Sequence, residues 1–435
     1  MFRCGRAVTD ITPPIGLYLT GFGGRTGPAK GVHDGLYALA VAISDDKDEI
    51  VIVSLDLCGL DPDVVKSIRE GAEVKTGIAT ENIALCCSHT HSGPATYTLR
   101  GIEYRDESYI SGIEKLIVGA IHEASENKRE STLRFGEGKC EIGINRRERT
   151  PSGEIILGRN PLGVVDPTVS VMEIESAGTN TVLYNYASHP VVLGPANLLY
   201  SADFPGYAAK TIEGSMRDAV AMFIQGCAGD INSKVGAGTF EDSGRLGGSL
   251  GAEVLRAVGR SEVETDPRLE SASRKARLEL ELPSDEEIER SRAQYKDNLM
   301  SAKEKGDRPW MDYLSSFSKW ADAAAELARR GERRPIHEVE VQALRVGRTV
   351  LVTIPGEPFI EMALEIKARS KFRHTIVAGY VNDSSIGYIP TPQAFAEGGY
   401  EVTAYRETTV ASLTPACYHA VLEVAIQLCD EVHSR

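Results

Sequence analysis

The sequence lacks an apolar run long enough to cross a membrane, because no stretch approaches the ~18 consecutive apolar residues that a span requires. Its start also lacks the ~7–15-residue apolar stretch of a signal peptide, since residues 1–14 soon become polar and contain proline. The eight cysteines are scattered without CxxC spacing, and several lie in apolar runs. This usage is typical of reduced, buried thiols and not of a disulfide framework. We therefore expect a cytoplasmic protein without a membrane span.

Positively charged residues are also fewer than negatively charged ones. The 48 Lys and Arg residues are outnumbered by 62 Asp and Glu residues, which leaves a formal net charge of −14. Such a surface repels phosphate backbones and anionic lipids, so we expect neither nucleic acid nor a stable membrane association among its partners. A small-molecule substrate is not excluded, because a local pocket can have the opposite sign, and a homo-oligomer remains open. The hydrophobic content of 42% and charged content of 25% are those of a soluble globular protein.

What is present is an alternation of short apolar runs and amphipathic stretches over most of the chain. The predicted strands are 50–57, 82–88, 181–188, 219–225, 350–354 and 374–381, and the predicted helices are 62–76, 106–127, 205–216, 242–259, 357–370 and 408–432. This alternation predicts a layered α/β fold with a mixed or mostly parallel sheet flanked by helices. Such sheets bind ligands at the C-terminal ends of their strands, so we expect a functional site there.

The segment 284–335 departs from this pattern. It is dense in Glu, Arg, Lys and Ala, and it carries Trp310, Tyr313, Phe317 and Trp320. These aromatic residues are spaced along one face of a helix. We expect a pair of exposed helices inserted between core elements and packed by that face. The first interpretation is a helical hairpin without a catalytic role, and the second is a lid or an oligomer contact.

Two histidines follow one of the predicted strands. The apolar run 83–86 leads into the sequence CSHTHSGP at 87–94. Side chains alternate between the faces of an extended backbone, so His89 and His91 point to the same side. Because histidine is a common zinc ligand, a pair of imidazoles at a strand end indicates a metal site. The alternative is a pair of hydrogen-bonded histidines at a strand edge.

Another predicted strand also ends on a histidine. His189 follows the run 182–188, and Pro190 then stops the strand pairing. His189 is either a metal ligand or a satisfied core histidine. Asp203 lies just ahead of a predicted helix, where it can act as an N-cap or orient a ligand histidine. We also count Asp203 as a candidate substrate-binding residue.

Three further candidate groups follow later strands. Glu357 lies in the predicted strand-to-helix turn IPGEP at 354–358, where the N-terminus of the helix favours a carboxylate. Together with two histidines, Glu357 would complete a catalytic zinc site with one open coordination position. Asp230 and Asn232 follow a Gly-rich turn, and they either hydrogen-bond a substrate or form an Asx turn. Tyr388 and Tyr400, taken alone, are packing residues.

Together these motifs resemble the N-terminal catalytic domain of the neutral (alkaline, non-lysosomal) ceramidase family. The matches are His-Thr-His-Ser-Gly-Pro at 89–94, Ile-Asn-Arg at 144–146, the strand ending on His189, Cys-Ala-Gly-Asp at 227–230, Ile-Pro-Gly-Glu at 354–357, and Gly-Tyr at 387–388 followed by Tyr400. They occur in the family's order over most of the chain. The combination is far more specific than any one motif. Three segments near the N-terminus, 10–14, 31–34 and 53–57, match the family as well.

The resemblance implies a catalytic site with one metal ion. The implied ligands of a zinc ion, Zn²⁺, are His89, His189, Glu357 and Tyr388. Zinc would supply an activated water as the nucleophile. The resemblance further implies that three catalytic residues, His91, Arg146 and Tyr400, surround the substrate carbonyl. His91 would pass a proton to the leaving group, Tyr400 would stabilise the oxyanion, and Arg146 would hold a polar or anionic group of the substrate.

The chain departs from the family where ceramidases have a serine two residues after Gly-Asp, because that position is Asn232 here. We also expect the family's C-terminal β-sandwich domain to be absent, and residues 1–435 to form a single catalytic domain with a helical insertion at about 284–335. We predict a zinc-dependent hydrolase in which a zinc-bound water attacks a carbonyl of a small polar substrate: an amide, ester, lactone, or keto-cyclitol or sugar-derived compound. The alternatives are an N-acylsphingosine amidohydrolase (ceramidase) and a non-catalytic binding protein on the same fold.

Overall fold

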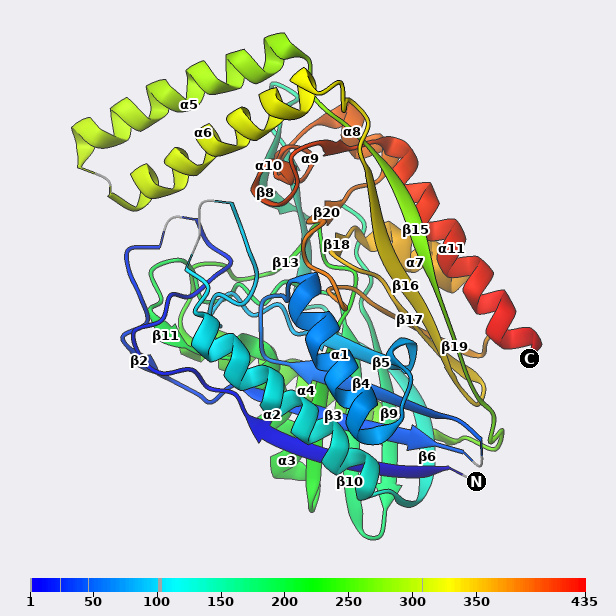
Figure 1. Ribbon diagram of the computed structural model, residues 1–435. Helices are drawn as coiled ribbons and strands as arrows, with labels where there is room; N and C mark the ends of the chain where they lie inside the picture. Colours follow the sequence, from blue (N-terminus) through cyan, green and yellow to red (C-terminus); the bar gives the residue numbers. More distant parts are fainter. Residues whose placement is uncertain (1, 24, 46, 101–103, 307) are drawn as a thin grey trace.

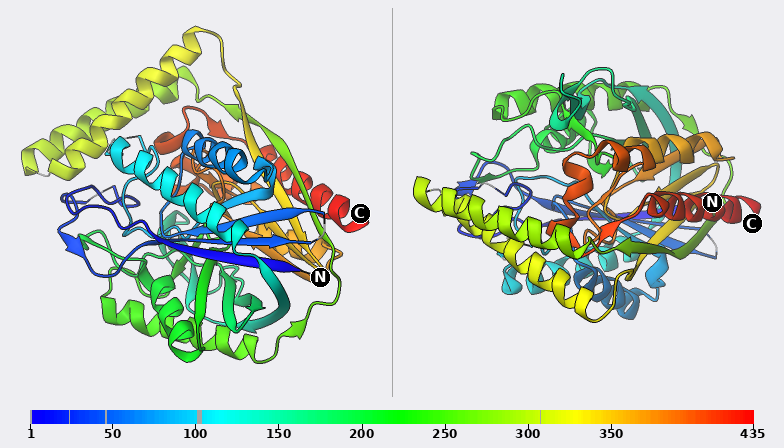
Figure 2. Two further views of the ribbon diagram at one scale, coloured as in Figure 1. Left: turned by 60° about the horizontal axis from the view of Figure 1, so that its bottom comes forward. Right: turned by 90° about the horizontal axis from the view of Figure 1, so that it is seen from above.

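The computed structural model describes residues 2–23, 25–45, 47–100, 104–306 and 308–435. They form a mixed α/β structure in four layers, in which two β-sheets pack face to face and helices cover both outer faces (Figures 1 and 2). The predicted α/β class is confirmed. The inner layer between the sheets is apolar: Ile52 and Cys86 of one sheet share a buried cluster with Leu351 and Ile376 of the other.

The larger sheet contains the N-terminal half of the chain. Its strands follow one another in the order β12 (Ala219–Gln225), β10 (Thr179–Tyr186), β9 (Thr168–Ser176), β6 (Arg129–Lys139), β1 (Arg3–Asp10), β3 (Tyr37–Ser44), β4 (Glu49–Leu55) and β5 (Ile83–Cys87), with β14 (Glu262–Val263) beside β6. The pairs β4–β5 and β10–β12 are parallel, whereas β1–β3, β3–β4, β6–β9 and β9–β10 are antiparallel. The sheet is therefore mixed, and the mostly parallel alternative is wrong.

A short turn shows why antiparallel pairing prevails. β9 and β10 are joined by Ala177 and Gly178 alone, and both residues have positive φ angles, of 46° and 83°. A two-residue turn of this kind matches the twist of an antiparallel hairpin, whereas parallel neighbours need a crossover of a dozen or more residues.

The second sheet contains most of the C-terminal half. Its order is β19 (His374–Ala378), β17 (Thr349–Thr353), β16 (Ile336–Val346), β15 (Leu269–Glu281) and β21 (Ser412–Leu413). The pair β17–β19 is parallel, and the long strands β15 and β16 are antiparallel. Helices α7 (Ile360–Arg369) and α11 (Pro415–Ser434) cover its outer face and share a buried apolar cluster with it.

Helices on the outer face of the larger sheet fall into two groups. α1 (Pro62–Thr76) and α2 (Glu107–Glu126) pack over β3, β4 and β5, and α3 (Asp203–Ser215) and α4 (Phe240–Val258) pack over β9, β10 and β12 (Figure 1). The ends of α1 are those that its sequence predicts, because proline at its first position and Gly77 in the left-handed region (φ 76°) are typical helix boundaries.

Two helices begin later in the structure than the sequence predicts, and one of these differences lies at the site. The helix predicted from residue 357 begins at Ile360, because Glu357–Pro358 form the short strand β18, which pairs in parallel with β20 (Tyr388–Ile389). The helix predicted from residue 408 begins at Pro415, since β21 precedes it. Among the described helices none combines the length and the apolar character needed to cross a bilayer.

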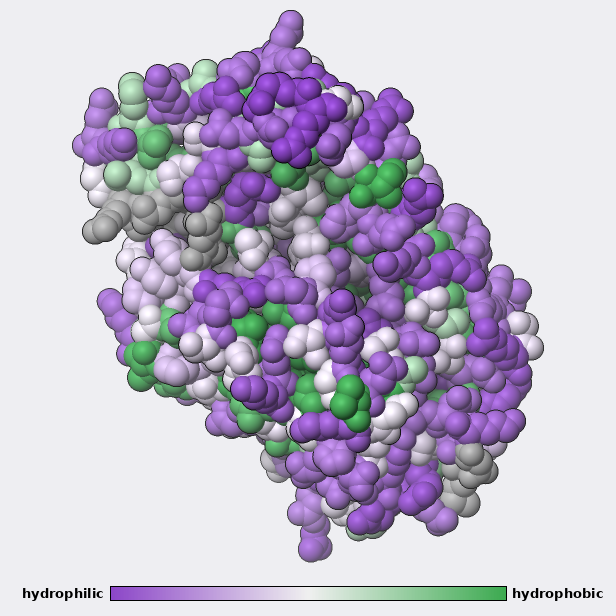
Figure 3. Space-filling model, viewed as in Figure 1, coloured by the Kyte–Doolittle hydropathy of each residue, from purple (hydrophilic) through white to green (hydrophobic). Residues whose placement is uncertain are grey.

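Residues 285–305 and 308–329 form two helices side by side that project beyond the layered body (Figures 1 and 2). α5 (Asp285–Lys305) begins with a capping box between Ser284 and Glu287, and α6 (Arg308–Arg329) returns to β16. Phe317 and Trp320 are buried where the pair meets the body, whereas the side chains of Trp310 and Tyr313 lie outside those that the structure describes. The outer face of α5 is mainly hydrophilic (Figure 3).

Candidate metal centre

Three side chains from three different strand ends converge on one buried point. His89 follows β5, His189 follows β10, and Glu357 stands in β18 after β17. The Nε2 atoms of His89 and His189 lie 3.5 and 3.1 Å from Oε2 of Glu357, and their side chains are 3%, 0% and 14% exposed. Two imidazole nitrogens and a carboxylate oxygen within 4.8 Å of one another are a donor set that suits zinc. The residues therefore fit the metal ion that the sequence implies.

Backbone carbonyls orient both histidines. Nδ1 of His89 donates to the carbonyl of Cys58 at 2.7 Å, and Nδ1 of His189 donates to the carbonyl of Ala228 at 2.6 Å. With the proton on Nδ1, the Nε2 lone pair of each ring faces the centre, which is the usual arrangement of a metal-binding histidine. Burial lowers the pKa of His89 to about 4 and that of His189 to about 3, so both rings are neutral at pH 7.

The backbone at His89 is in an uncommon conformation. Its φ angle is +63°, and its N–H donates to the carbonyl of Leu57 at 2.9 Å. Tyr380, after β19, also has a positive φ of 59°, and its ring lies 4.2 Å from the His89 ring between centroids. A left-handed conformation at non-glycine residues is retained where the surrounding structure enforces it, often at functional sites. Tyr380 was not predicted; its position at the end of a strand was the available signal.

Tyr388 lies directly beside Glu357. The two residues are register partners of β18 and β20, and the neighbouring Tyr388 side chain acts to lower the pKa of the Glu357 carboxyl against the effect of burial. Burial and the neighbouring Glu357 charge raise the pKa of Tyr388 well above its usual value, so the phenol is neutral. The structure thus brings together all four residues that the resemblance implies as metal ligands.

Arg146 forms one wall of the centre. It lies in β7 (Gly143–Arg149), and its Nε donates to Oε1 of Glu401 at 2.8 Å while its Nη1 donates to Oδ1 of Asn232 at 3.2 Å. The guanidinium also stacks over the Tyr388 ring at 5.1 Å. Its Nη2 is buried without a hydrogen-bond partner among the described residues, which leaves a donor suited to a substrate oxygen. Glu401 is an anchor that the sequence did not reveal.

His91 lies beside the three-residue cluster. Its Nε2 is 3.1 Å from Nε2 of His89, and its Nδ1 is buried without a partner among the described residues. Cys58, His89 and His91 form a second group with donor atoms within 4.8 Å. The set with His189 and Glu357 is the better metal site, because burial raises the pKa of the Cys58 thiol and keeps it protonated, whereas a metal needs the thiolate.

Known proteins of one family match most of this chain. Residues 2–252, more than half of the chain, match the model of the neutral/alkaline non-lysosomal ceramidase N-terminal domain. The chain belongs to this family. The resemblance found in its motifs is thereby confirmed, and members of the family are hydrolases.

Similar members match nearly the whole chain at low identity. Neutral ceramidases of Mycobacterium tuberculosis and Pseudomonas aeruginosa are each 24% identical over 92% of this chain, which corresponds to 73% and 68% of their own length. The crystal structure of the Pseudomonas aeruginosa neutral ceramidase superposes with a TM-score of 0.77 at 21% identity, covering 100% of this chain and 75% of that one. A second solved structure, a ceramidase complexed with C2, has the same TM-score at 19% identity. These structures establish the common fold.

Two predicted substrate-binding residues of this family member are engaged in structural contacts. Asp230 accepts hydrogen bonds from the N–H of Ile360 at 2.9 Å and from the Asn145 amide at 2.8 Å, and so it ties the start of α7 to β7. Asp203 accepts hydrogen bonds from the N–H of Leu193 and from the Ser243 hydroxyl, at 3.1 and 2.9 Å.

These contacts bear on the two expected substrate-binding roles. Both carboxylates are almost completely buried and accept hydrogen bonds from structural donors, so the geometry favours a structural role over substrate binding. Asp203 does not orient the ligand histidine either, because the His189 ring donates to backbone carbonyls. Asn232 differs from both, since it contacts Arg146 at the centre.

Tyr400 is close to the centre but turned toward a carboxylate. It begins the short helix α9 (Tyr400–Thr403), and its ring packs edge-on against Tyr388 at 5.7 Å. Its hydroxyl donates to Glu407 at 3.3 Å. The predicted oxyanion role of Tyr400 therefore requires that its hydroxyl turn from Glu407 toward the substrate.

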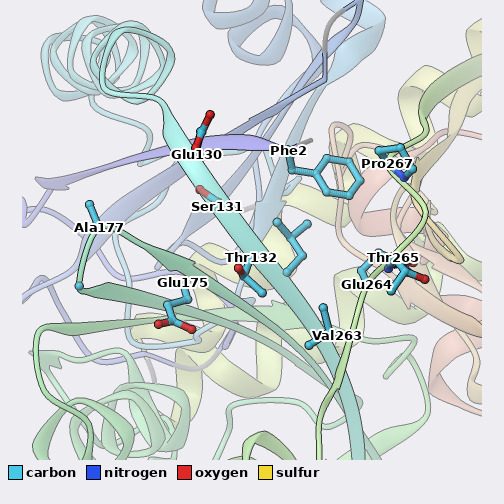
Figure 4. Close-up of a pocket in the computed structure, with 12 residues that line it drawn as sticks. Phe2, Glu130, Ser131, Thr132, Glu175, Ala177, Val263, Glu264, Thr265 and Pro267 are labelled. Carbon is cyan, nitrogen blue, oxygen red and sulfur yellow. Dashed lines mark hydrogen bonds between the residues drawn. The ribbon is translucent and has the colours of Figure 1, made fainter.

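One cavity lies away from the metal centre. A cavity of about 710 Å³ opens between β6 and the segment that leads into β15, lined by Phe2, Glu130, Glu175 and Pro267 among others (Figure 4). None of the predicted site residues lines it. Glu264 on its wall is paired with Arg348 at 3.0 Å, so we assign this cavity no catalytic role.

The backbone of Gly21 lies close to the His91 ring, so a substitution at Gly21 tests the position of His91. A Cβ atom at Gly21 would lie 2.3 Å from Cγ and 2.6 Å from Nδ1 of His91. We expect Gly21→Ala to displace the ring and to lower kcat by about 10²-fold, the usual loss for a misplacement of ~1 Å. Zinc content should not change. Metal analysis and steady-state kinetics check both expectations.

Gly16→Ala is the matched control. Gly16 has a similar φ of +106°, but no atom lies within 4 Å of the point that its Cβ would occupy. The two variants therefore share the backbone strain, and the clash is confined to Gly21. Equal losses of activity in both variants would show that strain, and not the position of His91, is responsible.

Proposed function

We propose that this chain is a zinc-dependent amidohydrolase that cleaves an N-acyl amide of the ceramide class. The observation that carries the proposal is the convergence of His89, His189 and Glu357 beside the unpaired Nη2 donor of Arg146. Relatives described as neutral ceramidases, which match 92% of the chain, favour this alternative over the small polar substrate expected from the sequence. The zinc site would stand at the C-terminal ends of β5, β10 and β17, with Tyr388 as a neutral fourth ligand.

A bound zinc ion would act as a Lewis acid and activate a water molecule as the nucleophile. The surrounding residues have separate tasks. Arg146 donates from Nη2 to the carbonyl oxygen of the substrate and stabilises the negative charge that develops on it. His91 receives the proton that water loses and passes it to the leaving nitrogen, so the C–N bond breaks to give a carboxylate and an amine. Asn232 and Glu401 hold the guanidinium in place.

A small polar substrate is the second candidate, and Asn232 favours it. The family's motif has a serine at this position, whereas here an amide oxygen accepts a hydrogen bond from Nη1 of Arg146. An amide group beside the guanidinium adds hydrogen-bonding capacity that suits a hydroxyl-bearing substrate. We also propose a cytoplasmic location, which the eight buried free cysteines support.

The decisive experiment compares two amides with the same acyl group on the zinc-loaded protein. N-hexanoylsphingosine tests the ceramide class, and N-hexanoylglucosamine tests the small polar class. We expect faster release of hexanoate from the first, loss of turnover after chelation, and recovery with Zn²⁺. Preference for the glucosamide would support the second candidate, and Asn232→Ser should then shift the preference toward the sphingosine amide.

The same preparation tests the non-catalytic alternative. A catalytic site requires about one zinc ion per chain, measured by inductively coupled plasma mass spectrometry, and a lower melting temperature after chelation, because a bound metal stabilises the folded state. Protein without stoichiometric zinc, with an unchanged melting temperature and no turnover of either amide, would contradict the proposal and favour a binding protein.

A further inference from the structure

Arg406 connects the projecting helices to the body of the molecule. It belongs to the short helix α10 (Tyr405–Thr408), which lies at the base of the α5–α6 pair (Figure 1). Its guanidinium carbon lies 5.0 Å from the centroid of the Trp320 ring of α6, and its Nη1 donates to the hydroxyl of Tyr295 of α5 at 3.2 Å. Both helices of the pair therefore contact the same cation, and a cation over an indole face is attracted to it.

The aromatic side chains that contact Arg406 are themselves fixed. Trp320 is completely buried, and its indole N–H donates to the carbonyl of Val410 at 2.9 Å. The Tyr295 ring is stacked on Phe317 with 4.7 Å between centroids. The aromatic face predicted from the sequence thus packs one end of the helical pair onto the segment that carries Arg406.

The residue next to Arg406 contacts the candidate site. Glu407 accepts the hydrogen bond of the Tyr400 hydroxyl at 3.3 Å, and its backbone carbonyl accepts the N–H of Arg100 at 2.6 Å. Tyr400 packs on Tyr388, whose ring lies under the guanidinium of Arg146. A continuous set of contacts therefore leads from α5 and α6 through Arg406, Glu407 and Tyr400 to the metal centre.

The segment between the helical pair and the site depends on such contacts for its position. α9 and α10 have four residues each. Helices this short do not form alone, since nucleation of a helix is unfavourable and only tertiary packing stabilises so few turns. The Glu401–Arg146 pair ties α9 to the site, and the position of the Glu407 acceptor of the Tyr400 hydroxyl depends on what holds α10.

We propose that the α5–α6 pair is a positioning element of the catalytic site: Trp320 and Tyr295 fix Arg406, and α10 thereby holds Glu407 and the Tyr400 hydroxyl at a set distance from the metal centre. Arg406 is the positioning residue, and it touches neither substrate nor metal. The inference rests on the proposed function, because it uses Tyr400 in its predicted role of stabilising the oxyanion during amide hydrolysis. It assigns the inserted helices a role in catalysis that the first interpretation of the sequence denied them.

Arg406→Met tests this role, because methionine keeps much of the apolar stem and removes the cation and its donors. We expect kcat for N-hexanoylsphingosine to fall by about 10-fold or more, with KM within about 3-fold of wild type and zinc content unchanged, since displacement of a group used in the transition state lowers kcat. Arg406→Lys retains the charge over Trp320 and should restore part of the loss. Tyr295→Phe, which removes one acceptor and keeps the stack on Phe317, should give a smaller loss.

Arg292→Met is the matched control. Arg292 of α5 also reaches α6, through Asp322 at 3.1 Å, and it pairs with Glu289 of its own helix at 2.8 Å; among the described residues its guanidinium contacts only this pair of helices. Its substitution should leave kcat within about 2-fold of wild type. Equal losses in Arg292→Met and Arg406→Met would overturn the proposal, and so would a wild-type kcat in Arg406→Met.

Hydrogen–deuterium exchange separates this inference from the proposed function. We expect the peptide over 399–409 to exchange faster in Arg406→Met than in wild type or Arg292→Met, whichever substrate the enzyme uses. If wild-type protein with stoichiometric zinc does not cleave the amide, the proposed function fails, and the exchange result still decides whether the helical pair holds α10. Unchanged exchange in Arg406→Met would overturn the inference on its own.

Discussion

Glu357→Gln is expected to release the metal and to lower kcat/KM by about 10³-fold or more, because a metal-dependent mechanism loses its activated nucleophile with the ion. Glutamine has the shape of glutamate and can still contact His189 and Tyr388. It lacks the negative charge that, in this site, faces two neutral histidines and a neutral phenol. Glu357 is the one carboxylate of the described cluster, so its charge is the main attraction for a divalent cation.

Metal analysis, kinetics and thermal unfolding together test this prediction. Burial raises the pKa of Glu357, which means that its charge is unfavourable when no metal is bound. Metal-free Glu357→Gln should therefore melt at or above the temperature of metal-free wild type, whereas zinc should stabilise only the wild type. Glu361→Gln is the control, because Glu361 lies four residues along, on α7, outside the metal cluster. Stoichiometric zinc in Glu357→Gln, with activity within about 10-fold of wild type, would contradict the assignment.

His91→Ala is expected to abolish most of the turnover while the metal stays in place. A general acid–base group contributes typically about 10²–10⁴-fold to a rate, and we expect a loss in this range. Zinc should remain stoichiometric, because His91 approaches His89 but is absent from the set of His89, His189 and Glu357. Added imidazole should restore part of the rate in the space left by the side chain.

Measurements of turnover and zinc content also decide which of the two neighbouring histidines binds the metal. If His91→Ala loses zinc and His89→Ala retains it, then His91 is the ligand and His89 the proton carrier. His33→Ala serves as a control for histidine removal, because His33 is paired with Asp34 near the surface and stacks on Phe240 outside the metal cluster. A loss of activity in His33→Ala equal to that in His91→Ala would show a general effect on folding.

Local sequence was sufficient for the parts of the site that follow directly from a strand end. The runs before His89, His189 and Glu357 predicted strands that the structure contains as β5, β10 and β17, with boundaries shifted by at most a few residues. An apolar run followed by histidine, proline or glycine is a local signal, since the strand ends where its pairing stops. The family's motifs then indicated that these separate ends belong to one site.

Antiparallel strands were the part of the fold that the sequence pattern missed. In the chain β1, β6 and β16 are each followed by another strand, and β15 leads into the inserted pair α5–α6, so these strands fell outside the strand–helix alternation used for the prediction. Their pairing builds the two sheets, and the apolar packing of one sheet on the other brings the strand ends together. Long-range pairing of this kind is not encoded in any short window of the chain.

The sequence by itself determined which residue types stand at the strand ends: two imidazoles, a carboxylate and a phenol, in an order that identifies the family. Only the tertiary structure decided what each of them does there. It showed that carbonyls of Cys58 and Ala228 set the histidine tautomers, that Glu401 anchors Arg146, and that Asp203 and Asp230 are committed to structural hydrogen bonds. The physical reason is that a side chain's chemistry is fixed by its identity, whereas its proton, charge and orientation depend on partners that lie far away along the chain.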